Sequence, residues 1–317
     1  SPYTVYESMV RAGELAQRSP AGPVYLSVST ETLMDEWVPP SNGRTVPGAP
    51  RTLTAPEDVD KLAKLLVKAK NPVIYTEAAG RETETYEALV ALSELLALPV
   101  VETSGALFAN FPKDHPMHQG NDFGPFRDDA DLAVVIRTRA PWYPPSDKPP
   151  SAVVAVMDEV PHRDTMVYQS LQADMYLEGN AATTLVSLAE AATALGIDEK
   201  AVEARRARLT EVHDKLVADK KAVQGEARKK TPIDPIWLCA ALSEVMPDGT
   251  IFVDEVTTHT GCTREHISLN QPQTLFTRQG GLGQGMGLSL GVKLAKSESP
   301  VVTLIGDGAF LYNPVLG

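Results

Sequence analysis

Cysteine is scarce in this sequence of 317 residues, which contains only Cys239 and Cys262. Two cysteines are too few for the disulfide framework of a small secreted protein or for a cysteine-rich metal cluster. We therefore expect both thiols to be buried or incidental and the compartment to be reducing. A cytoplasmic location is predicted, with an organelle left open.

The sequence also lacks an excess of positive charge and any long hydrophobic run. Lys and Arg number 29 against 41 Asp and Glu, and the resulting net charge of −12 argues against a nucleic-acid partner, which needs a basic surface. No apolar run approaches the roughly 20 residues that a membrane helix requires. We expect a soluble protein without nucleic-acid or membrane partners. Its length predicts about two domains.

The first part of the sequence contains too little structure to fold alone. It begins at Ser1 with no initiator methionine and no signal-peptide pattern, and it continues with a predicted helix over 5–18 and the strand-like segment GPVYLSVS. One helix and one strand cannot bury a core, so we expect residues 1–38 to dock on another structure or to be the remnant of a larger domain. A proline-rich linker over 39–55 follows.

Helices and strands alternate regularly from Pro56 onward. The segment PEDVDKLAKLLVKAKNP places its apolar residues on one stripe of a helix and ends at Asn71-Pro72. After it we predict strands over 73–76, 99–102, 132–137 and 152–157, and helices over 82–97 and 181–195. Parallel strands need such crossover helices, so residues 56–197 are predicted to form an α/β domain with a mostly parallel sheet.

A long helix with charges of both signs is predicted over 200–230. Arg205, Arg206 and Arg208 could form a binding face, but acidic residues are interleaved with them. We therefore interpret residues 198–231 as a solvated linker helix.

The last unit, residues 232–317, is predicted to be a second α/β domain. We expect, in order, a helix over 234–245, a strand over 250–253, a loop over 254–260, a glycine-rich helix start and a strand over 301–305. Because the carboxyl ends of parallel strands share one edge of a sheet, the loops after these strands should meet there.

A Gly-Asp-Gly turn follows the last predicted strand. This strand, VVTLI, is short, apolar and β-branched, and Gly306 and Gly308 permit a tight turn that holds Asp307 at its carboxyl end. A helix predicted over 309–316 can offer its first amides to an anion. A phosphate and a hard cation both fit there, although Asp307 supplies only one of the oxygens that Mg²⁺ takes. The alternative is an ordinary turn with a capping aspartate.

Two other segments carry candidate residues near the same edge. After the strand over 250–253, Thr257 and Thr258 bring hydroxyls and His259 a ring that can bind phosphate oxygens or a polar substrate. In RQGGLGQGMGLSLGVKLA, glycines on both sides isolate Leu282 where a backbone or a flat ligand must come close. The alternatives are an ordinary loop histidine and a core leucine.

Together, GGLGQGMGLSLGVKLA and VVTLIGDGAF resemble the diphosphate-binding (PP) domain of thiamine diphosphate-dependent enzymes, in the group that contains acetolactate synthase and benzoylformate decarboxylase. The domain order agrees. GPVYLSVS resembles the last strand of the family's pyrimidine-binding (PYR) domain, and NPVIYTEAAG, LPVVET and FPKDHPMHQG resemble its central domain. The resemblance covers nearly the whole chain, ending in a truncated PP domain.

The resemblance implies a role for each candidate residue. Asp307 would bind the Mg²⁺ that anchors the diphosphate of thiamine diphosphate, and Leu282 would hold the cofactor in its bent conformation. His259 would be a catalytic candidate. The other residues that would contact the cofactor are Thr257, Thr258, Gly281, Gly283, Gly306, Gly308 and Ala309. The implied reaction is decarboxylation or carboligation of a small-molecule 2-oxo acid.

The sequence departs from the family in two places. The metal motif of the family continues to an Asn ligand, and Asn313 is too near the turn to be that residue. The PYR domain, which carries the glutamate that activates the cofactor, is represented only by its tail. We therefore expect a fragment of a longer enzyme, inactive by itself, with a split enzyme as the alternative. The intact enzyme is expected to be a homodimer or homotetramer.

The cofactor set and the functional class each have an alternative. Some relatives bind FAD on the central domain, but the segment TRAPWYPPSDKPP differs from their pattern, so FAD is disfavoured. The choice among decarboxylase, carboligase and oxidase stays open, because the fold does not fix the function. The rival class is a non-catalytic nucleotide-binding or assembly module that has lost its active site. The presence of both Asp307 and Leu282 argues against it.

Overall fold

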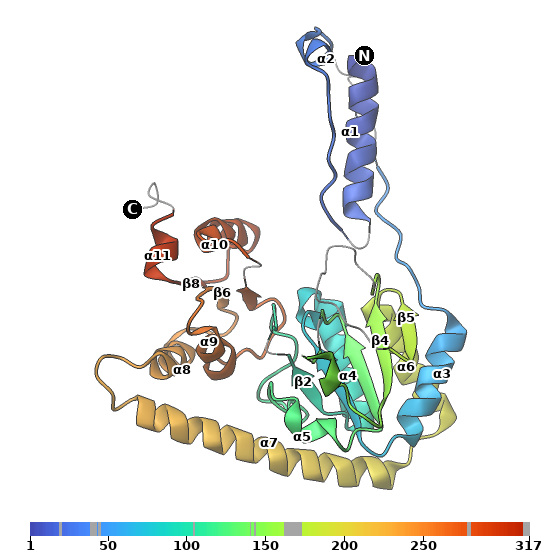
Figure 1. The fold of residues 1–317 in the computed structure, drawn as a ribbon, viewed down its shortest axis with the longest axis vertical. Coiled ribbons are helices and arrows are strands. Elements are labelled where there is room, and N and C mark those ends of the chain that lie inside the picture. The colour runs from blue at the N-terminus through green and yellow to red at the C-terminus, as the bar shows by residue number, and fades with distance from the viewer. Residues whose placement is uncertain are drawn as a thin grey trace.

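The structure is a computed structural model that describes residues 1–18, 21–38, 43, 46–103, 105–139, 141–142, 144–161, 173–277 and 280–312. Asn313, discussed above, lies outside these ranges. Within them, two parallel β-sheets with helices packed around them form the body of the molecule (Figure 1). This arrangement confirms the predicted α/β class. No helix in the described ranges is long and apolar enough to cross a membrane.

The first sheet has five parallel strands in the order β2-β1-β3-β4-β5. They are β1 (Pro72–Thr76), β2 (Val100–Glu102), β3 (Leu132–Ile136), β4 (Val153–Asp158) and β5 (Met175–Glu178). The first four confirm the predicted strands. Strand β5 was missed because it is four residues long and ends in a glutamate, so its apolar signal is weak.

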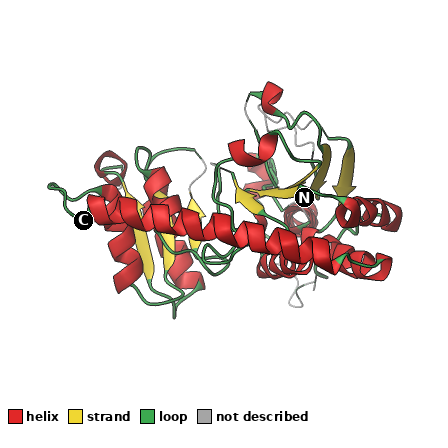
Figure 2. Cartoon of the chain, turned by 90° about the horizontal axis from the view of Figure 1, so that it is seen from below, coloured by secondary structure: helices red, strands yellow, loops and turns green. Residues whose placement is uncertain are grey.

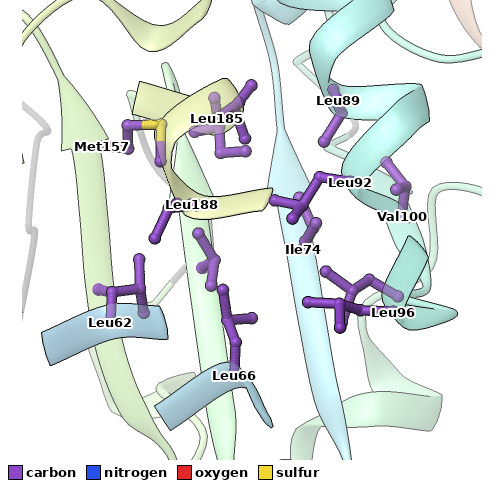
Figure 3. Close-up of a cluster of buried hydrophobic side chains, with 14 of the residues drawn as sticks. Leu62, Leu66, Ile74, Leu89, Leu92, Leu96, Val100, Met157, Leu185 and Leu188 are labelled. Atoms are coloured by element: carbon purple, nitrogen blue, oxygen red, sulfur yellow. The ribbon is translucent and has the colours of Figure 1, made fainter. Parts of the chain in front are cut away.

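The core of the first domain lies between this sheet and three helices. The three predicted helices are present as α3 (Pro56–Lys68), α4 (Thr83–Leu96) and α6 (Ala181–Leu195), and α6 packs against both α3 and α4. Figure 3 shows Leu62 and Leu66 of α3 close to Leu188 of α6 within one buried cluster. Alternate strand residues serve opposite faces, as Ile74 joins this cluster while Tyr75 joins a second one.

The second sheet has three parallel strands in the order β7-β6-β8. Its strands and helices are α8 (Pro235–Val245), β6 (Ile251–Glu255), α9 (Thr260–His266), β7 (Leu275–Thr277), α10 (Gln284–Ala295), β8 (Val301–Ile305) and α11 (Asp307–Phe310). The predicted loop over 254–260 is wrong at both ends, since Asp254 and Glu255 belong to β6 and Thr260 begins α9. Backbone amides bind both buried carboxylates, which lets charged residues end a strand.

Shorter elements complete the two domains. They are the 3₁₀ turns η1 (Ala79–Arg81) and η2 (Pro145–Asp147) and the helix α5 (Gly124–Arg127). Cys239 is buried and Cys262 half-buried, and both thiols are free, as expected.

The N-terminal segment stands apart from both sheets (Figure 1). Helix α1 (Pro2–Gln17) has no buried residue, and α2 (Thr30–Met34) follows an extended stretch. The strand expected over 22–29 is not formed. In the described chain no neighbouring strand lies beside this stretch to accept its backbone hydrogen bonds, and a single strand is not stable in water.

Helix α7 (Glu199–Ala227) crosses both domains (Figure 2). The interpretation as a solvated linker is wrong for one face, because Arg205 is only 8% exposed. Its guanidinium donates to the carbonyls of Leu96 at 2.6 Å, Ala97 at 3.0 Å and Ala69 at 3.1 Å. These carbonyls lie at the C-terminal ends of α3 and α4. Carbonyls at a helix end have no hydrogen-bond partner within their own helix. Arg205 therefore caps two helices at once.

We expect Arg205→Met to lower the melting temperature by roughly 5–10 °C. Removing the guanidinium leaves buried carbonyls without donors at a cost of about 2–3 kcal/mol, and each kcal/mol shifts the melting temperature of such a domain by about 2–4 °C. Thermal unfolding followed by circular dichroism measures the shift. The matched control is Arg208→Met on the exposed face of the same helix. An equal shift in both variants would contradict the capping role.

Candidate functional site

The candidate residues fall into three segments, each following one of three adjacent parallel strands. Residues 280–283 come after β7, residues 257–259 after β6, and residues 306–309 after β8. Phe276 pairs with Val253, and Glu255 pairs with Ile305. Because the strands are parallel and neighbouring strands lie about 4.8 Å apart, the three segments begin at one edge of the sheet.

The Glu255 carboxylate ties two of these segments together. It is 1% exposed and accepts hydrogen bonds from the backbone N–H groups of Gly283 at 2.5 Å and Gly285 at 2.5 Å, and from that of Gln284 at 3.3 Å. A Cβ atom at Gly285 would lie 2.6 Å from Oε2 of Glu255, so a side chain there would collide with the carboxylate. The first amides of α10 are therefore engaged inside the protein.

The glycine-rich turn presents Leu282 to the outside. Gly281 and Gly283 have φ angles of 61° and 79°, in the left-handed region that glycine adopts at little cost. Leu282 between them is 51% exposed, so it is not a core leucine. The backbone N–H groups of Gly283, Gln284 and Gly285 are bound by Glu255. The exposed apolar side chain of Leu282 is therefore the group of this turn that a ligand could contact.

Two hydroxyls and a histidine ring lie exposed after β6. Thr257, Thr258 and His259 are all exposed. His259 is the residue that precedes α9, and its carbonyl accepts hydrogen bonds from the N–H of Cys262 at 2.9 Å. The backbone of this segment is thus fixed by the start of α9, while its polar side chains face outward.

Asp307 does not act as an ordinary cap. Its exposed carboxylate accepts no hydrogen bond from the residues that the structure describes. A Cβ atom on Gly306 or Gly308 would find nothing within 4 Å, so both flanks of the carboxylate are open to a ligand. Ala309 is buried, and it can contribute only backbone groups.

The donors at this edge are hard oxygen atoms. Asp307 is a lone carboxylate, and no group of three or more His, Cys, Asp or Glu able to hold a metal occurs among the described residues. A cation bound here would need further oxygens from its ligand or from water. One carboxylate, two hydroxyls and open glycines fit a diphosphate that carries Mg²⁺, which prefers such ligands.

Sequence reasoning located these three segments but missed what fixes them. Glu255 was placed in a loop because a charged residue at a strand end is usually exposed. Two features of the sequence could have indicated this role. Glu255 directly follows an apolar strand, and the glycine-rich segment later in the sequence has backbone amides that no side chain covers.

We expect Glu255→Ala to speed amide hydrogen exchange at Gly283 and Gly285 by roughly 10-fold to 100-fold. The variant removes a charged acceptor worth about 1.5–3 kcal/mol, and each 1.4 kcal/mol corresponds to a factor of ten. Exchange followed by mass spectrometry or NMR measures the effect. Glu298→Ala, an exposed glutamate before β8, should leave these amides unchanged. Unchanged protection in Glu255→Ala would show that the turn is held by other contacts.

Two family models match the chain. The model described as thiamine pyrophosphate enzyme, central domain, matches residues 59–188, which contain the whole first sheet. The model described as thiamine pyrophosphate enzyme, C-terminal TPP binding domain, matches residues 255–315, which contain all three segments of the candidate site.

Curated proteins and solved structures agree with these matches. A "Probable acetolactate synthase large subunit" of Methanocaldococcus jannaschii is 25% identical over 98% of this chain and 55% of its own length. A "Probable 2-ketoarginine decarboxylase" of Pseudomonas aeruginosa is 26% identical over 98% and 54%. The chain spans about half the length of the curated relatives it matches.

The crystal structure of benzoylformate decarboxylase from Polynucleobacter necessarius shares the fold. The TM-score is 0.75 at 23% identity, over 98% of this chain and 57% of that one. Together, the two family models, the curated relatives and the shared fold show that the chain belongs to the family of thiamine diphosphate-dependent enzymes.

Proposed function

We propose that this chain provides the diphosphate-binding part of an active site that uses thiamine diphosphate and Mg²⁺ to decarboxylate or join 2-oxo acids. The main support is the meeting of three segments at the carboxyl edge of β7, β6 and β8. They bring an exposed apolar side chain, two hydroxyls and a carboxylate without a partner among the described residues. The curated relatives carry the names of a synthase and a decarboxylase, which agrees with this chemistry.

Each segment has its own task in this proposal. Thr257 and Thr258 donate hydrogen bonds to diphosphate oxygens, and Asp307 binds the Mg²⁺ that neutralises the diphosphate. Leu282 supports the bent conformation of the cofactor, and His259 is available to bind the carboxylate of the substrate. When bound, thiamine diphosphate supplies a nucleophilic carbon that adds to the 2-oxo acid and holds the electron pair left by departing CO₂.

We expect Asp307→Ala to weaken thiamine diphosphate binding at least about tenfold in the presence of Mg²⁺, because the diphosphate loses its metal-mediated anchor. Leu282→Ala should weaken binding less than about threefold, because the diphosphate contacts remain. Isothermal titration calorimetry compares these variants with the unchanged chain. Asp248→Ala, which changes an exposed carboxylate before the amino end of β6, is the control.

Two outcomes of this titration would count against the proposal. Equal losses in Leu282→Ala and Asp307→Ala would make Leu282 a packing residue rather than a support for the cofactor. No binding by the unchanged chain would favour the alternative of a non-catalytic module.

We propose further that the first sheet does not hold FAD. Nucleotides bind such sheets at the point where strand order reverses, which here lies between β1 and β3. In the described part of this edge, Glu77 follows β1 with a side chain only 3% exposed. Arg139, which follows β3, donates to this carboxylate from its backbone N–H at 2.8 Å and from Nε at 2.5 Å. Glu77 and Arg139 therefore bind each other at this point, and the Arg139 guanidinium is engaged there.

The turn after β1 is also closed to phosphates. The N–H of Ala79 donates to the hydroxyl of Thr76, and the N–H of Gly80 donates to Oδ1 of Asn110 at 3.0 Å. The carbonyl oxygen of Ala109 fills the space beside Gly80, since a Cβ there would lie 1.7 Å from it. These amides cannot cradle a diphosphate.

We expect the purified protein to lack flavin absorbance in the visible range and to leave the fluorescence of added FAD unquenched. The reason is the ion pair of Glu77 and Arg139 at the switch point. Absorption spectroscopy before and after denaturation, with a titration of FAD, measures this. Release of flavin in a 1:1 ratio to protein would overturn the assignment.

A further inference from the structure

A second cavity lies between the first domain, helix α7 and the second domain. It has a volume of about 370 Å³ and contains none of the candidate residues at the sheet edge. This size falls in the range of about 300–1,000 Å³ that is usual for small-molecule sites. Cross-domain hydrogen bonds brace it, from the hydroxyl of Tyr86 to the carbonyl of Asn270 at 2.9 Å and from the N–H of Lys113 to Oδ1 of Asn270 at 3.0 Å.

Lys113 lines this cavity, and its ammonium group makes no ion pair or hydrogen bond within the part of the chain that the structure describes. The residue is 8% exposed. Burial lowers the pKa of Lys113, while the charge of Glu102 acts in the opposite direction. A buried cation that is offset only by charges beyond ion-pair distance is costly, so the position of Lys113 suits an anion in the cavity.

Glu102 is not that anion, because its carboxylate is already bound. It accepts hydrogen bonds from the N–H of Asn110 at 3.0 Å and from Nε2 of His118 at 3.3 Å. Burial raises the pKa of Glu102, but the hydrogen bond from His118 and the charge of Lys113 outweigh burial and hold the pKa at about 2. Burial lowers the pKa of His118, which favours a neutral ring that donates to the carboxylate.

A second polar group in the cavity also lacks a partner. Thr103 lines the cavity, and its hydroxyl is buried and makes no hydrogen bond within the described chain. Thr103 directly follows Glu102 at the end of β2, and both Thr103 and Lys113 line the cavity. Two unsatisfied donors that line one cavity suit a single acceptor group with several oxygens.

The other charged residues that line the cavity carry both signs. Lys220 of α7 and Arg264 of α9 are partly buried. Glu265 has a side chain 53% exposed, and Asp219 is bound by Lys215 at 2.8 Å. Lys113, Lys220 and Arg264 thus line the cavity together with these two carboxylates and that of Glu102. The rest of the lining is largely apolar and includes Phe108, Leu216, Val223 and Leu275.

We propose that this cavity is a binding site for a small organic anion, with a carboxylate or phosphate head at Lys113 and Thr103 and an apolar body against α7. The ligand would contact the first domain, α7 and the second domain together, so it would stabilise their relative placement. This site is separate from the sheet edge, and the proposal does not depend on the cofactor assigned there.

The test measures binding of three probes to the 317-residue chain by calorimetry. They are 4-methylpentanoate, inorganic phosphate and the neutral 4-methylpentanamide. We expect 4-methylpentanoate or phosphate to bind saturably and the amide to bind at least about tenfold more weakly, because an uncharged head cannot pair with Lys113. No saturable binding of either anion would overturn the proposal.

Variants identify the site independently of activity. Lys113→Met should weaken anion binding about tenfold or more, because the anion loses the charge that it would pair with. Thr103→Val should weaken binding about threefold. The matched control is Lys221→Met, an exposed lysine beside Lys220.

The variants also define what would contradict the site. If Lys113→Met destabilises the free protein and leaves anion affinity unchanged, Lys113 has only a structural role and the proposal fails. Lys113→Arg keeps the charge and should retain binding within about threefold. Loss of binding in Lys113→Arg together with full binding in Thr103→Val would likewise overturn the assignment.

Discussion

The carboxylate of Glu255 is the constraint on which the candidate site depends. It lies at the end of the central strand of the second sheet and accepts hydrogen bonds from three backbone N–H groups, those of Gly283 and of the first two residues of α10. A buried charge is stable only when it is satisfied in this way, so the strand end and the turn hold each other in place. The exposed position of Leu282 follows from this arrangement, because the turn cannot rotate without breaking these hydrogen bonds.

Buried charged groups have two different roles in this structure. At Glu255 and Arg205, each buried charged group meets several backbone partners and stabilises the fold. At Lys113 the charged group has no such partner within the described residues, although the residue is as buried as Arg205. Buried charges that are satisfied define the architecture, whereas one that is unsatisfied indicates a place where the protein is incomplete without a ligand.

Much of the fold could be predicted from the sequence, and the exceptions have physical causes. Strands β1 to β4 and helices α3, α4 and α6 were predictable because each shows a clear apolar period over enough residues. The segment 22–29 has the same apolar signal but no neighbouring strand, so its local preference is not realised. Strand β7 has only three residues and was not recognised, whereas β2 is equally short but continues the apolar segment LPVV, which lengthens its signal.

The site was predictable where residue type alone sets the chemistry. The Gly-Asp-Gly turn places Asp307 directly after a strand, and the glycines on both sides of Leu282 isolate this leucine. Both features can be recognised from the local sequence. The role of Glu255 depends on a turn almost 30 residues later, as the role of Arg205 depends on helices more than 100 residues earlier. Such long-range partners cannot be identified from local patterns.

Helix α7 sets a fixed distance between the two domains, and this has a consequence for insertions and deletions. Near one end Arg205 binds the C-terminal carbonyls of α4, and near the other Gln224 lies 3.2 Å from the ring of His266 in α9. An α-helix turns by about 100° and rises about 1.5 Å per residue. One added residue between these two contacts would turn them away from each other, so that only one could remain docked. Seven residues, about two turns, would restore the facing but move the domains about 10 Å apart. The length of α7 between its two contacts is therefore under as strict a constraint as any residue in the site.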